Sequence, residues 1–371
     1  MGVPVKIVRL LPFSVVLGLA ACGSSPDILP STQVVRASPV VCMDGARADR
    51  VLAATWNMAI GFDVTDLLFL NPDSVRAIHD RAEKIHTDAL GTLPRLRVRL
   101  MAQEIARTGP EIVGLQETMH MVWNGVLVAD FLDTLMSDLR SLGAEYTLYT
   151  STLNEATLHI PDTTGGSDSI VFEFHEGNAF LVSPRWTVAG SGTVHYRDVI
   201  PVDLLGLKTV TDRAAQWVQL QDTSGFRLEV WNTHLEVLDA QAIGQAGEFA
   251  LFSDSLRAVQ LNAGFKPSGR LFLGDINSQP GSIASDIFLQ AHWNDSWDST
   301  RFGSGPTYGS GSLRDSTRVL TERLDRILDQ GGCAVDTAFV HGNTAVATDS
   351  GPLFPSDHGV VVAKLRYGIR L

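Results

Sequence analysis

Six short polar motifs in this chain each come at the end of an apolar, strand-like run. Together they supply two histidines, four carboxylates and three asparagines, of which Asn57 and Asn277 are the candidates for chemistry. In chain order they are Thr55-Trp56-Asn57, Leu115-Gln116-Glu117, Asn232-Thr233-His234, Gly274-Asp275-Ile276-Asn277, Leu324-Asp325-Arg326-Ile327 and Ser356-Asp357-His358. Because strand ends at one edge of a sheet can gather distant side chains, this set suits the hydrolysis of a phosphate ester assisted by a hard divalent cation.

The oxygen-bearing residues of the first two motifs are candidate ligands for that cation. Glu117, helped by Asn57, could hold Mg²⁺ or Mn²⁺ against the oxygens of a phosphoryl group. The sequence has no Cys or His cluster with the spacing of a zinc site. We therefore expect an oxygen-ligated metal bound chiefly through Glu117.

The remaining motifs supply candidates for moving protons and orienting the phosphate. His358 could take the proton from an attacking water while a nearby carboxylate fixes its tautomer. His234 could donate a hydrogen bond to the phosphoryl group, and Asp275 and Asn277 could orient the nucleophile and the phosphate. Each motif alone has a structural explanation, for example a turn, a solvated carboxylate or an ion pair. The combination of all six favours catalysis.

The N-terminus carries the features of a secretory signal. Lys6 and Arg9 precede an apolar run over 10–21, which is too short to span a bilayer stably. We predict that residues 1–21 are a signal peptide. Leu19-Ala20-Ala21-Cys22-Gly23 resembles the bacterial lipoprotein box, which implies lipid on Cys22 and a protein anchored to the outer membrane or the cell surface. The alternative is an ordinary signal peptide with an incidental cysteine.

The rest of the chain divides into a tether and one large domain. Residues 22–48 begin at the cysteine expected to carry lipid, are rich in Ser, Pro and small residues, and lack an amphipathic period, which indicates a flexible tether. Residues 49–371 are enough for one catalytic domain. The formal net charge of the 371-residue chain is −12, so general attraction to a phosphate backbone is excluded and a polyanionic substrate would need a local basic patch or a bound metal.

Two further cysteines remain if Cys22 is lipidated. Cys42 and Cys333 could form a disulfide outside the cytoplasm, or they could be two separate buried cysteines. A bridge would join the tether to the sheet.

The pattern of apolar residues predicts two packed sheets with helices on the outside, that is, one four-layer α/β domain. The expected strands cover 50–57, 111–116, 178–183, 216–222, 226–233, 270–275, 323–329 and 359–365. Apolar stripes that begin at Val98, Val128 and Phe249 predict helices ending near Gly109, Gly143 and Gly264. The intervals 59–94 and 153–177 look like insertions into loops. Leu67-Leu68-Phe69-Leu70 in the first of them is a buried element or a lipid contact.

In their order, the motifs resemble those of the endonuclease/exonuclease/phosphatase superfamily, over about residues 50–368. The resemblance implies a four-layer α/β sandwich with two facing, mainly antiparallel sheets flanked by helices, and a site at one end of the paired sheets. It assigns Asn57 and Glu117 to the metal, His234 to phosphate contact, and catalytic roles to Asp275, Asn277, Asp325, Asp357 and His358. Arg213, in Asp212-Arg213-Ala214-Ala215, is a less specific match to a substrate-binding Arg.

These observations predict a Mg²⁺- or Mn²⁺-dependent phosphohydrolase. A phosphodiesterase acting on nucleic acid or on phospholipid headgroups, as a lipid-anchored monomer, is the first hypothesis. A phosphomonoesterase of the inositol-phosphate type is a second. A catalytically inactive surface module that keeps the fold for binding is a third, against which the intact catalytic set argues.

Overall fold

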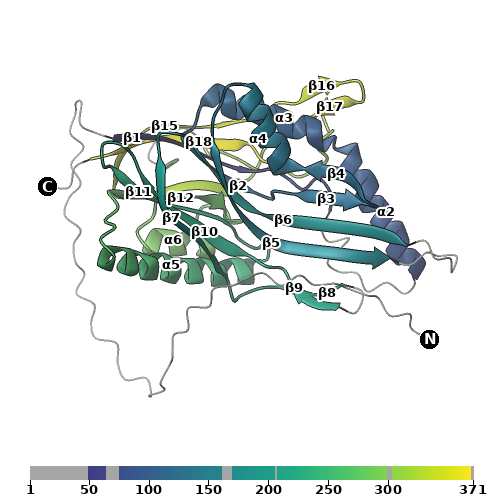
Figure 1. Ribbon diagram of the computed structural model, residues 1–371, viewed down its shortest axis with the longest axis horizontal. Helices are drawn as coiled ribbons and strands as arrows, with labels where there is room; N and C mark the ends of the chain where they lie inside the picture. The colour runs from purple at the N-terminus through teal and green to yellow at the C-terminus, as the bar shows by residue number, and fades with distance from the viewer. Residues whose placement is uncertain (1–48, 64–74, 161–168, 205–206, 299–302, 369–371) are drawn as a thin grey trace, which may run out of the picture.

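Two β-sheets lie face to face, and helices cover the outer face of each sheet (Figure 1). The computed structural model describes residues 49–63, 75–160, 169–204, 207–298 and 303–368. This arrangement confirms the predicted four-layer α/β sandwich. Cys22, Cys42 and Leu67–Leu70 lie outside the described residues, as does the side chain of Cys333, so the lipid and the disulfide stay predictions.

The first sheet brings β1 and β2 together in parallel, with Asn57 opposite Gln116. Within the described residues the sheet has eight strands, and β5 pairs along β6 outside the main path. In spatial order the strands are β15 (Gly332–His341), β18 (Val360–Tyr367), β1 (Asp49–Asn57), β2 (Ile112–Gln116), β6 (Ile170–Val182), β3 (His120–Trp123) and β4 (Val126–Asp130), with β5 (Thr147–Ile160) on β6.

The second sheet has six described strands and one parallel pair, in which His234 of β11 lies opposite Asp275 of β12. Asp275 in turn lies opposite Asp325, the first residue of β14. In spatial order the strands are β13 (Asn294–Asp295), β14 (Asp325–Gln330), β12 (Gly269–Asp275), β11 (Arg227–His234), β10 (Ala214–Gln221) and β7 (Thr187–His195). Two separate hairpins pair β8 (Pro201–Leu204) with β9 (Leu207–Val210) and β16 (Val346–Thr348) with β17 (Gly351–Leu353).

Strand β1 shows why the sheets pack in layers. Val51 and Ala53 face the second sheet, where they join residues such as Leu273 in the central core. Ala54 and Trp56 point the other way into the core beneath the helices. Alternate residues of a strand face opposite sides, so a strand that is apolar at every position is buried between two layers.

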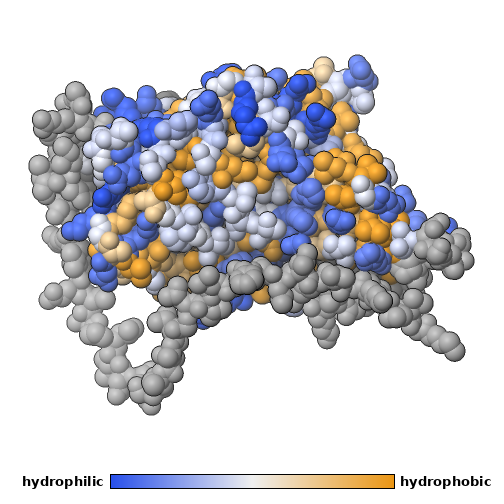
Figure 2. Space-filling model, in the orientation of Figure 1, coloured by the Kyte–Doolittle hydropathy of each residue, from blue (hydrophilic) through white to orange (hydrophobic). Residues whose placement is uncertain are grey.

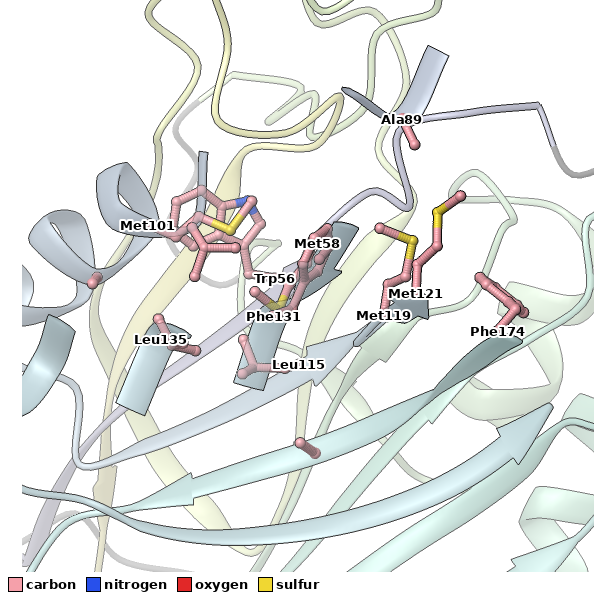
Figure 3. Close-up of a cluster of buried hydrophobic side chains, with 14 of the residues drawn as sticks. Trp56, Met58, Ala89, Met101, Leu115, Met119, Met121, Phe131, Leu135 and Phe174 are labelled. Atoms are coloured by element: carbon pink, nitrogen blue, oxygen red, sulfur yellow. The ribbon is translucent and has the colours of Figure 1, made fainter. Parts of the chain in front are cut away.

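The helices cover the outer faces through apolar stripes. On the first sheet lie α2 (Val75–Gly91), α3 (Pro94–Thr108) and α4 (Phe131–Ser141), and on the second lie α5 (Asp239–Asn262) and α6 (Ile283–Gln290). Figure 3 shows Met101, Phe131 and Leu135 from α3 and α4 packed near Trp56 and Leu115 of the sheet. None of the described helices is both long and apolar enough to cross a membrane, and Figure 2 shows hydrophilic and hydrophobic residues interspersed on the face in view.

Several predicted boundaries were wrong. The expected loop insertion over 153–177 is largely paired strand, because β5 and β6 pair from Thr147↔Val182 to Ile160↔Ile170. The interval 59–94 contains α2, whose Ala82, Ile85 and Ala89 are buried at helical spacing.

Two elements begin later than expected. The helix with the Gly143 stop starts at Phe131, because Val126–Asp130 forms β4 and the Asp130 side chain accepts a hydrogen bond from Asp133 N. The strand expected from residue 323 starts at Asp325.

Candidate active site

The motif residues meet where strand ends of the two sheets face each other. The parallel pairs β1–β2 and β11–β12 end at this edge. β14 runs antiparallel to β12 and therefore begins there. Asn57, Glu117, His234, Asp275 and Asp325 are consequently neighbours, although they are far apart in sequence. The loop that precedes β18 adds Asp357 and His358.

Asn57 joins the two sheets across the site. Its side-chain Nδ2 donates to Glu117 Oε1 at 2.9 Å and to Asp275 Oδ2 at 3.1 Å. The second oxygen of Glu117 accepts from the backbone N of Ile60 at 2.8 Å. Glu117 has φ 55°, a left-handed conformation that is uncommon outside Gly, which turns the chain directly after β2. The carboxylates of Glu117 and Asp275 are thus bridged by the side-chain amide of Asn57.

His358 and Asp325 form a buried pair. The Nδ1 of His358 lies 2.7 Å from Asp325 Oδ2, and both side chains are almost fully buried. Since a carboxylate can only accept, Nδ1 carries the proton. The other ring nitrogen, Nε2, points toward Asp275 Oδ2 at 3.7 Å. This is the arrangement that orients an imidazole for proton transfer at Nε2.

The backbone around His358 is tied to the end of β1. The hydroxyl of Ser356 donates to the carbonyl of Asn57 at 2.7 Å and accepts from the backbone N of His358 at 3.0 Å. The indole of Trp56 donates to the carbonyl of His358 at 3.0 Å. Asp357 is less buried, and its Oδ1 lies 3.9 Å from His358 Nε2.

His234 is held by a cation rather than by a carboxylate. Arg213 Nη1 lies 2.8 Å from His234 Nδ1, and because guanidinium groups only donate, Nδ1 is the acceptor. The other ring nitrogen, Nε2, lies 2.9 Å from Asn277 Nδ2, which also only donates, and 3.7 Å from Asp275 Oδ2. Asn277, with φ 47°, is fixed by its Nδ2, which donates to Leu235 O at 2.8 Å.

The charges of the site shift several pKa values. Burial, followed by the charge of Asp357, raises the pKa of Glu117 to about 7, and burial and the charge of Asp325 raise that of Asp275 to about 6. Burial opposes the charged form of His358, yet the carboxylates, led by Asp325, raise its pKa to about 10. Burial and the charge of Arg213 lower the pKa of His234 well below its usual value. The site is therefore rich in negative charge.

An oxygen-preferring dication fits this donor set on the Glu117 side. Glu117 and Asp275 are crowded carboxylates whose raised pKa values reflect the cost of charging them, and a cation would offset that cost. Asp275, Asp325 and His358 also form a group with ligand atoms within 4.8 Å of one another. In that group Asp325 is already hydrogen-bonded to His358 Nδ1, so only Nε2 of that ring is left for another partner.

Sequence reasoning missed two acids beside Arg213. Glu236 Oε2 accepts from Arg213 Nε at 3.3 Å, and Glu176 Oε1 lies 3.8 Å from Arg213 Nη1. Asn154 links the same cluster to β5 by donating to Glu176 Oε2 at 2.6 Å. Glu236 follows His234 by two residues and could have been noticed, whereas Glu176 lies inside the interval assigned to a loop. Arg213, which the sequence predicts to bind substrate, contacts His234 and Glu236 in the structure.

A second missed group is the buried Arg97 of α3. Its guanidinium donates to the carbonyls of Met58, Ala59 and Pro355, and so joins the segment after β1 to the segment before Ser356. Burial lowers its pKa to about 10, against the opposing charges of Asp357 and Glu117. Because no polar motif adjoins Arg97, the sequence alone predicts an ordinary surface residue of a helix.

The comparisons with known proteins concern the fold. No family model matches this sequence, and no curated protein is significantly similar to it. An endonuclease/exonuclease/phosphatase family protein from Bacteroides thetaiotaomicron has a similar structure, with TM-score 0.57 and 15% identity over 87% of this chain and 100% of that chain. A mannosyl-6-phosphatase from the same species gives TM-score 0.56 and 17% identity over 85% and 99%.

Truncated TDP2 from Caenorhabditis elegans gives TM-score 0.52 and 17% identity over 85% of this chain and 97% of that chain. At these identities the likeness establishes a shared fold: this chain has the four-layer sandwich seen in endonuclease/exonuclease/phosphatase proteins. The chemistry must be argued from the side chains.

Proposed function

We propose that this protein is a divalent-metal-dependent phosphohydrolase and that it cleaves phosphodiesters by in-line attack of water. The observation that carries the proposal is the convergence of the buried His358–Asp325 pair with His234, Asn277 and Glu117 around Asp275. The shared fold supports it, since the proteins of similar structure include a phosphatase by name.

The proton chemistry belongs to His358. In this proposal its Nε2 takes a proton from the attacking water, and Asp325 stabilises the imidazolium that forms. The ring must be neutral to begin this step, whereas the surrounding carboxylates favour the charged ring. A cation held by Glu117 would offset their negative charge and so lower the pKa of His358.

The phosphoryl group is positioned by the opposite side of the site. In this proposal His234 donates a hydrogen bond to one of its oxygens while Arg213 holds the opposite ring nitrogen, and Asn277 lies beside His234 to orient the group. Glu117 and the Asn57 side chain would hold Mg²⁺ or Mn²⁺, as the sequence predicts. When bound, such a cation neutralises the charge that builds on the phosphoryl oxygens.

The charge of the site favours a diester over a monoester. A diester carries one negative charge, and a monoester dianion carries two. Among the described residues near the site, Arg213 is engaged by Glu236 and His234, and Arg97 and Arg318 donate to backbone carbonyls. Few cationic groups therefore remain for a second substrate charge. Nucleic acid and phospholipid headgroups both supply such diesters.

The similarity to the mannosyl-6-phosphatase favours one alternative, a phosphomonoesterase. A purified protein should therefore be assayed with Mg²⁺ on bis(p-nitrophenyl) phosphate and p-nitrophenyl phosphate, then on DNA, sphingomyelin and inositol phosphates. We expect diester cleavage that His358→Ala abolishes. Faster release from the monoester would favour the alternative, and no release from any substrate would favour an inactive binding module.

We further propose that Cys22 carries lipid and anchors the protein outside the cytoplasm. The support is the sequence Leu19-Ala20-Ala21-Cys22-Gly23 after a short apolar run. Cys22→Ser should release the protein from membranes or leave its signal uncleaved. Unchanged, detergent-dependent membrane association with a normally processed N-terminus would exclude lipidation at this residue.

A further inference from the structure

Four ionisable side chains form a row across neighbouring strands β4, β3, β6 and β5. Asp130 lies opposite His120, His120 lies opposite His175, and His175 lies opposite Glu155. The row therefore has the order acid, histidine, histidine, acid. Directly opposite residues of paired strands have Cβ atoms about 4.5–5.5 Å apart, so the two imidazoles are held side by side by the sheet.

The row lies on the more accessible face of these strands. Within the described residues, the alternate positions Met121, Phe172 and Phe174 are buried in the core beneath the helices. The side chains of His120 and His175 are 36% and 37% exposed, enough for an ion to reach them from solvent.

The spacing of the two rings matches a shared metal ion. Their centroids are 5.4 Å apart, and their planes are tilted by 33°. Two imidazoles bound to one tetrahedral ion, each through a nitrogen at about 2.0–2.1 Å, have centroids about 5.2 Å apart.

Each outer carboxylate engages one nitrogen of its histidine and leaves the other for a ligand. Asp130 Oδ2 lies 2.9 Å from His120 Nδ1, and Glu155 Oε1 lies 3.6 Å from His175 Nε2. His120 Nε2 and His175 Nδ1 have no hydrogen-bond partner among the described residues. A carboxylate behind a metal-ligating histidine is the usual arrangement, because it fixes the ring and makes the ligand nitrogen more basic.

We propose that His120 and His175 form a surface site for an imidazole-preferring divalent transition metal such as Cu²⁺ or Zn²⁺, with Asp130 and Glu155 as its outer supports. The site differs in chemistry from the catalytic one, where oxygen atoms favour Mg²⁺ or Mn²⁺. It follows from the register of the strands and does not depend on the proposed hydrolysis.

The test uses Cu²⁺ as the probe, with excess Mg²⁺ present to fill an oxygen-ligated site. The first equivalent of Cu²⁺ bound to the full chain should give an electron paramagnetic resonance spectrum with coupling to two imidazole nitrogens. His120→Gln and His175→Gln should each remove that signal and weaken the binding of this equivalent at least tenfold. Glu155→Gln should keep the coupling to two imidazole nitrogens in the spectrum. It should weaken Cu²⁺ binding by about tenfold, because only the carboxylate behind His175 is lost.

His341→Gln is the matched control. His341 is also half-exposed beside an acid, with Nδ1 3.9 Å from Glu104, but among the described residues no second imidazole contacts it. This variant should bind like the wild type, and all four variants should retain their hydrolytic activity. Equal Cu²⁺ binding by the wild type, His120→Gln and His175→Gln would overturn the proposal, as would a loss in only one of those two variants.

Discussion

Replacing Asp325 by Asn tests the role of the buried His358–Asp325 pair most directly. The change keeps the shape of the side chain and removes its charge. The backbone N of Asp325, which donates to Thr307 Oγ1 at 3.0 Å, is unaffected. Any large effect on turnover should therefore come from the loss of the charged partner of His358.

The structure sets the size of the effect. The carboxylates, led by Asp325, raise the pKa of His358 from about 6.5 to about 10 against the opposing effect of burial. A shift of this size corresponds to at most about 5 kcal/mol between the charged and neutral ring. Asp325 provides the shortest contact, at 2.7 Å, so Asp325→Asn should lower that pKa by well over one unit. Because the imidazolium is then less stabilised, turnover should fall about 10²–10⁴-fold.

Two measurements separate this effect from misfolding. Nuclear magnetic resonance titration of His358 in metal-free protein gives the pKa directly, and steady-state hydrolysis with Mg²⁺ gives the turnover. Since the folded-state pKa of His358 is raised, its stabilisation is present below about pH 6.5 and is lost as the pH rises through about 10. The stability difference between wild type and variant should shrink over the same range in thermal melts.

The matched control is Asp212→Asn, which alters another Asp–His pair at a more exposed position. Asp212 lies 2.9 Å from His195 Nδ1, and the His195 side chain is 54% exposed. Its activity should stay within about twofold of the wild type, because exposed ion pairs contribute little. Asp325→Asn with turnover within tenfold of the wild type, or with an unchanged pKa of His358, would refute the reasoning.

Four further predictions follow from the site and the fold. His234→Ala should lower turnover by about 10²–10⁴-fold with an unchanged circular dichroism spectrum, and near-full activity would assign phosphate contact elsewhere. Chelation should abolish hydrolysis, and Mg²⁺ or Mn²⁺ should restore it. Full turnover in excess chelator would contradict the proposed metal dependence. Burial raises the pKa of Asp329 to about 6, so the stability of the protein should fall as the pH rises from about 4 to 6. In denaturant titrations at pH 7, Asp329→Asn should therefore be more stable than the wild type by at most about 3 kcal/mol. The two proteins should be equally stable near pH 3. Cys42 and Cys333 should pair, which mass spectrometry of the non-reduced mature protein would show as the loss of two hydrogens; two free thiols would count against the bridge.

The strand ends were predictable because their signal is local. An apolar run that ends in a polar residue shows both the strand and the point where it leaves the core, as in Ala53-Ala54-Thr55-Trp56-Asn57. The number of strand-like runs and the apolar stripes of the helices likewise predicted two sheets between helices. The motif order added the resemblance that led to Glu117, His234 and His358.

Long polar strands were not predictable in the same way. Much of β5 and β6 is polar on one face, and their turn-rich connection suggests a loop when each is considered alone. Each strand is stabilised by the other, from Thr147↔Val182 to Ile160↔Ile170, and that pairing is not visible in either segment.

The sequence by itself determined which residues could do chemistry and at which strand ends they lie. Only the tertiary structure decided which groups meet: Arg213 with His234, Arg97 with the carbonyl of Pro355, and His120 with His175. The physical reason is that a contact across strands or layers depends on register and packing, which are set by the whole core. Likewise, the pKa of the Glu117 carboxyl group is raised only when folding removes water from it and brings Asp357 close.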